Sequence, residues 1–81
     1  MENIFVEQLN KLRRKQRLSQ NDLAQKLYVS RQSVSKWELG ETEPDITKLI
    51  NLAEIFGVSL DYLLAGVSTK RDLLLKVTDL H

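Results

Sequence analysis

Apolar residues recur at the spacing of helices, and not of strands, along most of the chain. Phe5, Leu9 and Leu12 follow the i, i+4, i+7 pattern of one helix face and predict a first helix over residues 3–16. No stretch in which apolar and polar residues alternate is long enough to predict a half-buried strand. We therefore expect an all-α fold.

Capping residues divide the following segment into two short helices. Ser19 and Asp22 have the spacing of a capping box, which predicts a helix that runs through Leu27. Ser30 is placed to cap the start of the next helix, and Gly40 lies where a glycine is expected just after a helix end.

The turn between the two short helices is very tight. Only Tyr28 and Val29 separate them, so the helices must cross steeply, and the small side chain of Ala24 lets their axes approach. This arrangement predicts a helix-turn-helix motif.

Two further helices are predicted downstream. Asp45 is a suitable N-cap for a fourth helix that ends at Gly57, and Ser59 starts a short fifth helix that stops at Gly66. The expected apolar stripe of the fourth helix consists of Ile46, Leu49, Ile50, Ala53 and Phe56.

The composition is that of one small globular domain. The 81 residues are 42% hydrophobic and 28% charged, and no apolar run approaches the roughly 20 residues that a membrane helix requires. The absence of cysteine excludes disulfides and thiolate metal sites. We expect a cytoplasmic protein with a domain over residues 1–66 and a C-terminal tail over residues 67–81.

The tail over residues 67–81 has a helical pattern of its own. Thr69 and Asp72 have capping-box spacing, and the segment that follows carries more apolar side chain than a monomer leaves in water. We expect a dimerisation helix, although the tail could also fold back on the fifth helix or begin a longer chain with an effector domain. The residues expected at a dimer contact are Leu73, Leu74, Val77 and Leu80.

The net charge of +1 hides an asymmetry between the two halves. Residues 1–40 hold 8 lysines and arginines against 4 acidic residues, whereas residues 41–81 hold 4 against 7. A basic half favours an anionic partner, most often nucleic acid. The basic residues at the end of the first helix also suit the helix dipole, so both explanations stay open. They are Lys11, Arg13, Arg14, Lys15 and Arg17.

The third helix carries two unlike faces. On a wheel of about 100° per residue, one arc has no apolar side chain and contains Arg31, Gln32, Ser35 and Lys36. The opposite arc contains Ser33, Val34, Trp37 and Glu38. The tryptophan is therefore expected to face the core, and the polar arc is free to contact a partner.

Residues 9–64 resemble the XRE family of helix-turn-helix proteins, which includes phage repressors and Cro-like proteins. The landmarks that carry the resemblance are Leu9 and Arg13, followed by "LSQNDLAQKL", "VSRQSVSKWELG", Pro44 and "LINLAEIFGVSLDYLL". The resemblance implies a compact five-helix, lambda-repressor-like bundle. It also implies that helix 31–39, the recognition helix, enters the major groove of double-stranded DNA.

The polar arc then has a target, because the major groove displays donors and acceptors on base edges. Gln32 and Lys36 are the first candidates for base contacts, since glutamine can bridge N6 and N7 of adenine and lysine can donate to guanine. Arg31 stands at the helix start, where it can bridge O6 and N7 of guanine or reach a phosphate. Ser35 is short and makes room for its neighbours.

The resemblance implies supporting roles for other residues. In this family a glutamine at the first position of the second helix touches phosphate and braces the recognition helix, which assigns that role to Gln20. The adjacent caps, Ser19 and Ser30, are further phosphate candidates. Glu38 is implied to pair with Arg13, and so to hold the recognition helix in place without contacting DNA.

Two features depart from the family pattern. Tyr28 stands where the turn often has glycine or asparagine, so either the turn bends differently or it carries a strain of roughly 1–2 kcal/mol. The loop "GETEPD" is acidic through Glu41, Glu43 and Asp45, where many relatives have basic residues. The acidic loop predicts a modest affinity for DNA of arbitrary sequence.

We therefore expect a transcriptional regulator, and specifically a repressor that binds a pseudo-palindromic operator as a homodimer, without metal or cofactor. An enzyme is not expected, because His81 is the single histidine and no nucleophile–base cluster or glycine-rich phosphate loop is present. The alternative is an antitoxin or protein-interaction module of the same fold whose main partner is another protein.

Overall fold

The computed structural model describes residues 3–66, which form five helices and their connections. The helices are α1 (Ile4–Lys15), α2 (Gln20–Leu27), α3 (Arg31–Glu38), α4 (Ile46–Phe56) and α5 (Leu60–Ala65). Over the described range there is no strand, so the predicted all-α fold is confirmed. The expected tail helix lies outside the described residues, and so do its candidate dimer contacts Leu73, Leu74, Val77 and Leu80.

Every one of these five helices begins at a side chain that caps it. In each case the capping oxygen accepts the backbone N–H three residues ahead, which satisfies one of the donors left free at a helix start. The first helix is slightly shorter than predicted, because Asn3 is its cap and Gln16 already lies past its end. The five capping residues are Asn3, Ser19, Ser30, Asp45 and Ser59.

The first four helices end in the same backbone turn, in which the chain passes through a left-handed residue. After α3 and α4 that residue is Gly40 or Gly57, which reach a positive φ without steric cost. After α1 and α2 it is Arg17 (φ 59°) or Tyr28 (φ 58°), for which the same conformation is strained. The sequence allowed either a turn that bends differently or a strained turn, and the structure has the strained one.

The core lies where α1, α4 and α5 meet the helix-turn-helix. Leu9, Leu23, Val34, Leu52 and Leu63, one from each helix, are fully buried. The remaining buried apolar residues of this cluster are Phe5, Leu12, Ala24, Leu27, Trp37, Ala53 and Phe56.

The expected stripe of α4 is wrong in part. Ile46 and Ile50 are exposed, whereas Leu52 is fully buried. The helix is apolar on two faces, and the face that packs on the core follows the spacing of Leu49, Leu52, Ala53 and Phe56.

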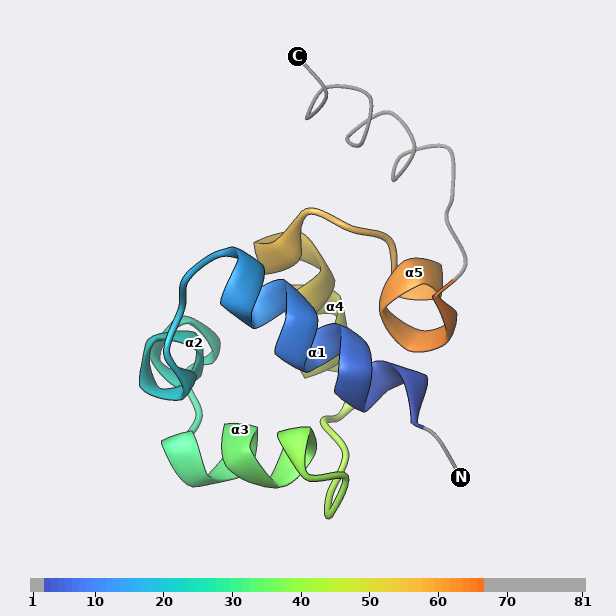
Figure 1. The fold of residues 1–81 in the computed structure, drawn as a ribbon. Coiled ribbons are helices and arrows are strands. Elements are labelled where there is room, and N and C mark those ends of the chain that lie inside the picture. Colours follow the sequence, from blue (N-terminus) through green and yellow to red (C-terminus); the bar gives the residue numbers. More distant parts are fainter. Residues whose placement is uncertain (1–2, 67–81) are drawn as a thin grey trace.

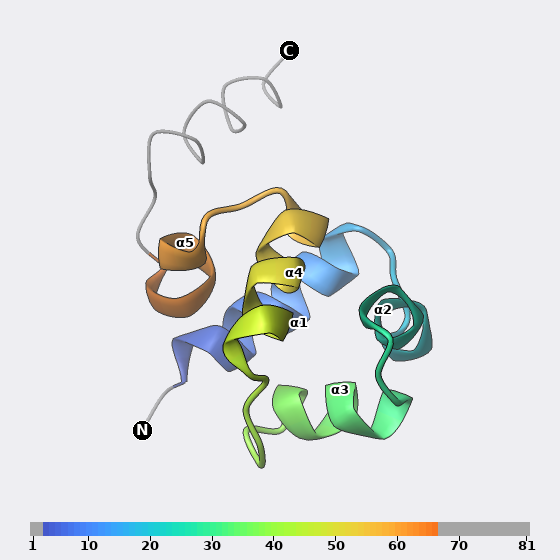
Figure 2. The ribbon, with the colours of Figure 1, turned by 180° about the vertical axis from the view of Figure 1, so that it is seen from behind.

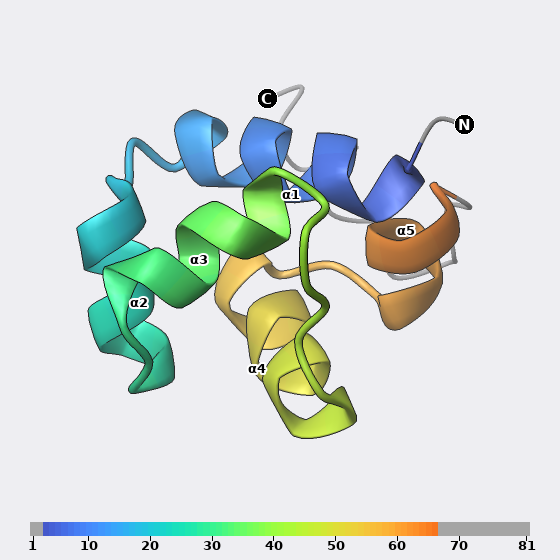
Figure 3. The ribbon, with the colours of Figure 1, turned by 90° about the horizontal axis from the view of Figure 1, so that it is seen from below.

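The arrangement leaves α3 at the edge of the molecule. Figure 1 shows α1 across the middle, α2 to one side of it and α3 below it, while Figure 2 shows α4 from behind. In the view from below, α3 lies in front of α1, and no other helix of the described part covers its outer side (Figure 3). The second helix of the motif is thus presented to solvent along its length.

Candidate nucleic-acid interface

The turn of the helix-turn-helix is built from backbone hydrogen bonds. Tyr28 ends α2 in the left-handed conformation, with φ 58° and ψ 42°. The backbone N–H of Val29 then donates to the carbonyl of Ala24 at 3.0 Å. This bond satisfies a carbonyl at the end of α2, and the chain then leads directly into α3.

A lysine from α4 holds the same turn from another side. Nζ of Lys48 donates to the backbone carbonyl of Leu27 at 2.8 Å. A cation at the C-terminal end of α2 is also favoured by the helix dipole. The end of α2, where the turn begins, is thus also held by a residue outside the motif.

The two faces of α3 differ as the wheel predicts. Val34, Trp37 and Glu38 are buried, and Trp37 is only 6% exposed, so the indole belongs to the core. Ser35 is half-buried. The exposed residues of the helix are Arg31, Gln32 and Lys36. Among residues 3–66, the side chains of Gln32 and Lys36 have no hydrogen-bond partner, so both are available to a ligand.

An ion pair ties α1 to the end of α3. Nε of Arg13 donates to Oε2 of Glu38 at 2.6 Å, and Nη2 of Arg13 donates to Oε1 at 3.1 Å. The two side chains are 12% and 5% exposed, so the pair is largely removed from water. The third arginine donor, Nη1, binds the carbonyl of Leu18 at 2.8 Å. This two-point geometry fixes the orientation of both groups.

Hydrogen bonds extend this ion pair to a side chain of α2 and to another at the start of α3. Nε2 of Gln20 donates to Oε1 of Glu38 at 3.1 Å. Nη1 of Arg31 donates to Oε1 of Gln20 at 3.4 Å. The structure therefore joins four side chains, in the order Arg13, Glu38, Gln20 and Arg31, into one network across α1, α2 and α3.

The serine caps use their hydroxyls within the protein. Ser19 Oγ accepts the backbone N–H of Asp22 at 2.9 Å, and Asp22 Oδ2 accepts the backbone N–H of Ser19 at 2.9 Å, which completes the predicted capping box. The hydrogen bonds from the backbone and side chain of Ser19 lower the pKa of Asp22 below its ordinary 3.8. Ser30 Oγ accepts from the backbone of Ser33 at 3.1 Å.

Comparison with known proteins identifies the fold that carries this arrangement. A helix-turn-helix family model matches residues 9–63, more than half of the chain. The chain belongs to the XRE-type helix-turn-helix family. Curated relatives are named as HTH-type transcriptional regulators, and the predicted family and five-helix, repressor-like bundle are confirmed.

Individual relatives agree with this assignment. The HTH-type transcriptional regulator YqaE of Bacillus subtilis is 44% identical over 68 residues, which cover 84% of this chain and 59% of YqaE. The transcriptional activator BcrR of Enterococcus faecalis is 44% identical over 62 residues, which cover 76% of this chain and 30% of BcrR. The chain thus spans less than two thirds of the length of either relative.

A solved structure of a repressor on DNA has the same fold. The P22 c2 repressor in complex with a synthetic operator superposes on this chain with a TM-score of 0.75 at 33% sequence identity. The match covers 82% of this chain and all of that one. The five-helix bundle therefore occurs in a protein that has been captured on DNA.

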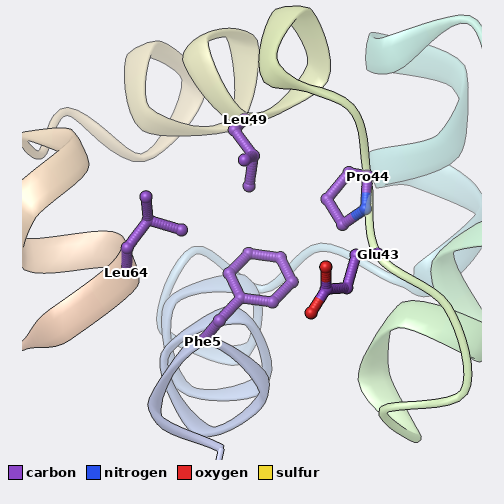
Figure 4. Close-up of a pocket in the computed structure, with 5 residues that line it drawn as sticks. All are labelled: Phe5, Glu43, Pro44, Leu49 and Leu64. Atoms are coloured by element: carbon purple, nitrogen blue, oxygen red, sulfur yellow. The ribbon is translucent and has the colours of Figure 1, made fainter.

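A small pocket lies away from the outer face of α3. It has a volume of about 130 Å³ and is lined by Phe5, Glu43, Pro44, Leu49 and Leu64. Figure 4 shows the apolar side chains converging from three helices and the loop after α3, with one carboxylate at the edge. None of the predicted DNA-contact residues lines this pocket, so it is separate from the candidate interface.

Two further features were searched for in the part of the chain that the structure describes. Residues 3–66 contain no group of three side chains that could hold a metal ion. Within the same residues no helix is long and apolar enough to cross a membrane.

The structure also adds contacts that sequence reasoning missed. Lys48 was not identified from the sequence, because helical spacing does not reveal its contact with Leu27, 21 residues away along the chain. The resemblance implied that Gln20 braces the recognition helix, but its partner there, Glu38, was not identified. Arg31 is exposed as expected, but its guanidinium also donates a hydrogen bond to the side chain of Gln20.

Proposed function

We propose that this regulator is a repressor that binds a pseudo-palindromic operator as a homodimer, with α3 of each protomer in the major groove. The observation that carries the proposal is the outer face of α3, where Gln32 and Lys36 are exposed and unpartnered among residues 3–66. The major groove of B-DNA is about 12 Å wide and admits one α-helix. A helix so placed brings these two head groups to base edges.

The side-chain network suggests which residues contact bases and which contact phosphates. Gln32 and Lys36 contact bases, and Ser35, half-buried on the same face, makes room for them. Arg31 is drawn by Gln20 towards the start of α2, where it can serve a base or a phosphate. Because Gln20 has a second N–H that the network does not use, it is suited to donate to a phosphate.

The caps and the ion pair complete the proposed interface. Ser19 and Ser30 begin α2 and α3, where exposed backbone N–H groups suit a phosphate. Arg13 and Glu38 contact no DNA in this proposal; they hold α3 at a fixed angle to α1. Single substitutions in this pair therefore weaken binding only by loosening the helix.

The proposed homodimer follows from the geometry of DNA. Repressors that recognise palindromes place two recognition helices about 34 Å apart, one helical turn of DNA. The apolar positions at 73, 74, 77 and 80 of the tail are the proposed contacts between protomers. We also propose that the regulator acts in the cytoplasm, where bacterial and phage DNA is located.

The experiment that tests the proposal is selection from randomised duplex DNA with the full chain, followed by titration at two salt concentrations. The proposal predicts a selected motif with two related half-sites and an affinity that falls as salt rises. A protein that retains no duplex even at low salt would contradict it and favour the antitoxin or protein-interaction alternative. Selection of a single half-site would contradict the homodimer alone.

A further inference from the structure

Tyr28 occupies the turn of the helix-turn-helix at an evident structural cost. Its φ of 58° lies in the left-handed region, which L-residues other than glycine and asparagine rarely adopt. At the ends of α3, α4 and α5 the corresponding residue is a glycine, namely Gly40, Gly57 or Gly66. The turn after α2 thus holds a bulky residue where three of the five helices end in glycine; the other exception is Arg17 after α1.

Within residues 3–66, no contact of the Tyr28 side chain offsets the strain of its backbone. The Tyr28 residue is 92% exposed, so its ring adds almost nothing to the core. Within residues 3–66 its hydroxyl makes no hydrogen bond. The turn itself needs only the backbone, because the N–H groups of Tyr28 and Val29 donate to the carbonyls of Gln25 and Ala24. Glycine or asparagine would make the same bonds with less strain.

The position of the turn indicates what the side chain is for. Tyr28 stands two residues before the cap of α3, at the end of α3 where Arg31 and Gln32 lie. Lys48 holds the adjacent Leu27 carbonyl at 2.8 Å, so the turn is tied to α4. Figures 1 and 3 show this turn at one edge of the molecule, where α2 meets the start of α3.

The chemistry of the Tyr28 side chain indicates which group of the DNA it would contact. A helix about 10–12 Å across fills a groove about 12 Å wide, so residues flanking the helix face the phosphates that border the groove. A phenol is a neutral donor that commonly contacts phosphate oxygens. We propose that Tyr28 donates its hydroxyl hydrogen to a backbone phosphate at the edge of the major groove. This inference rests on the proposed function, because it assumes that α3 occupies that groove.

Two substitutions of Tyr28 test the contact in the full chain. Tyr28→Phe keeps the ring and the strained backbone but removes the donor. Its dissociation constant for the selected operator should rise about three- to tenfold, with an unchanged melting temperature. Tyr28→Asn removes the phenol hydroxyl, leaves a side chain too short to replace it, and also relieves the strain. It should lose similar affinity while its melting temperature rises by about 4–8 °C.

Control measurements separate the effect of the strained backbone from the effect of the proposed phosphate contact. Arg17→Asn relieves the same left-handed conformation at the end of α1 and should also raise the melting temperature. Because a phosphate contact carries no sequence information, both Tyr28 variants should bind random duplex more weakly by the same factor and select the wild-type motif. An unchanged motif together with weaker binding supports the proposal.

The remaining outcomes overturn it in distinguishable ways. If both variants bind as tightly as the wild type, Tyr28 makes no DNA contact. If only Tyr28→Asn binds more weakly, the ring and not the hydroxyl is responsible, which contradicts the hydrogen bond. An altered preference at one base would mean a base contact. If the wild type itself retains no duplex, the proposed function fails first and this inference fails with it.

Discussion

At the residue scale, Glu38 joins the stability of the fold to the shape of the interface. Its carboxylate accepts hydrogen bonds from Arg13 and Gln20, although it lies on a helix whose outer side is polar and exposed. A carboxylate buried to this extent is stable only when charged donors surround it. The residue therefore fixes α3 relative to α1 and α2 and also orients Gln20 towards the proposed phosphate site.

A double-mutant cycle at Arg13 and Glu38 tests this role. Each single change to alanine leaves a partly buried charge without its partner and should cost about 3–5 kcal/mol of unfolding free energy. The double variant should lose clearly less than the sum of the two, because no charge is stranded. Chemical denaturation measures all four proteins. Strictly additive losses would show that the two side chains do not interact.

The matched controls for this cycle are exposed residues of the same types. Arg14→Ala and Glu54→Ala remove an arginine from α1 and a glutamate from α4, and both residues are exposed. Each should change the unfolding free energy by no more than about 0.5 kcal/mol.

At the element scale, the ends of the helices could be predicted far better than their packing. A cap acts within three or four residues, so Ser19, Ser30, Asp45 and Ser59 determine their helix starts locally. The buried face of α4 could not be predicted in the same way. That helix is apolar around most of its circumference, and contacts with other helices decide that Leu52 points inward.

The same distinction applies to the candidate interface. The two faces of α3 follow from its own periodicity, so its exposed polar residues were identified from the sequence. Contacts between helices depend on crossing angles that the spacing within one helix does not encode. For this reason the bonds from Lys48 to Leu27 and from Gln20 to Glu38 emerged only from the structure.

The capping box of α2 gives a prediction about pH. Folding lowers the pKa of Asp22, so its charged form stabilises the fold above the unfolded pKa near 3.8, and this contribution is lost as the pH falls towards the lower folded value. Asp22→Asn should therefore melt at a lower temperature than the wild type at pH 7. The difference should shrink below about pH 4, as followed by circular dichroism. A gap that stays constant down to pH 3 would contradict the role of the carboxylate.

At the scale of the whole molecule, the charge distribution should limit binding to DNA of arbitrary sequence. The loop between α3 and α4 holds exposed Glu41 and Glu43 at the end of the outward-facing helix. Negative side chains there oppose the phosphates that border a groove occupied by α3. Affinity for the correct operator must then come largely from contacts made by α2 and α3.

Reversing one loop charge tests this limit. Glu41→Lys should bind random duplex more tightly, and the slope of log affinity against log salt should steepen by about one unit, because one more phosphate is neutralised. Glu54→Lys makes the same change of charge near the other end of α4 and should leave the slope nearly unchanged. Equal effects of the two variants would mean that net charge, and not the position of the loop, sets the affinity.

Whether the outer face of α3 contacts bases is tested by the motif that Lys36→Ala selects, compared with the motif of the wild type. Preference at one base position in each half-site should relax by about 1–3 kcal/mol while the other positions are kept. Lys11→Ala, which removes the same charge from the exposed side of α1, should leave the motif intact. If Lys36→Ala selects the same motif with the same strength as the wild type, α3 does not contact bases through this residue and the account is contradicted.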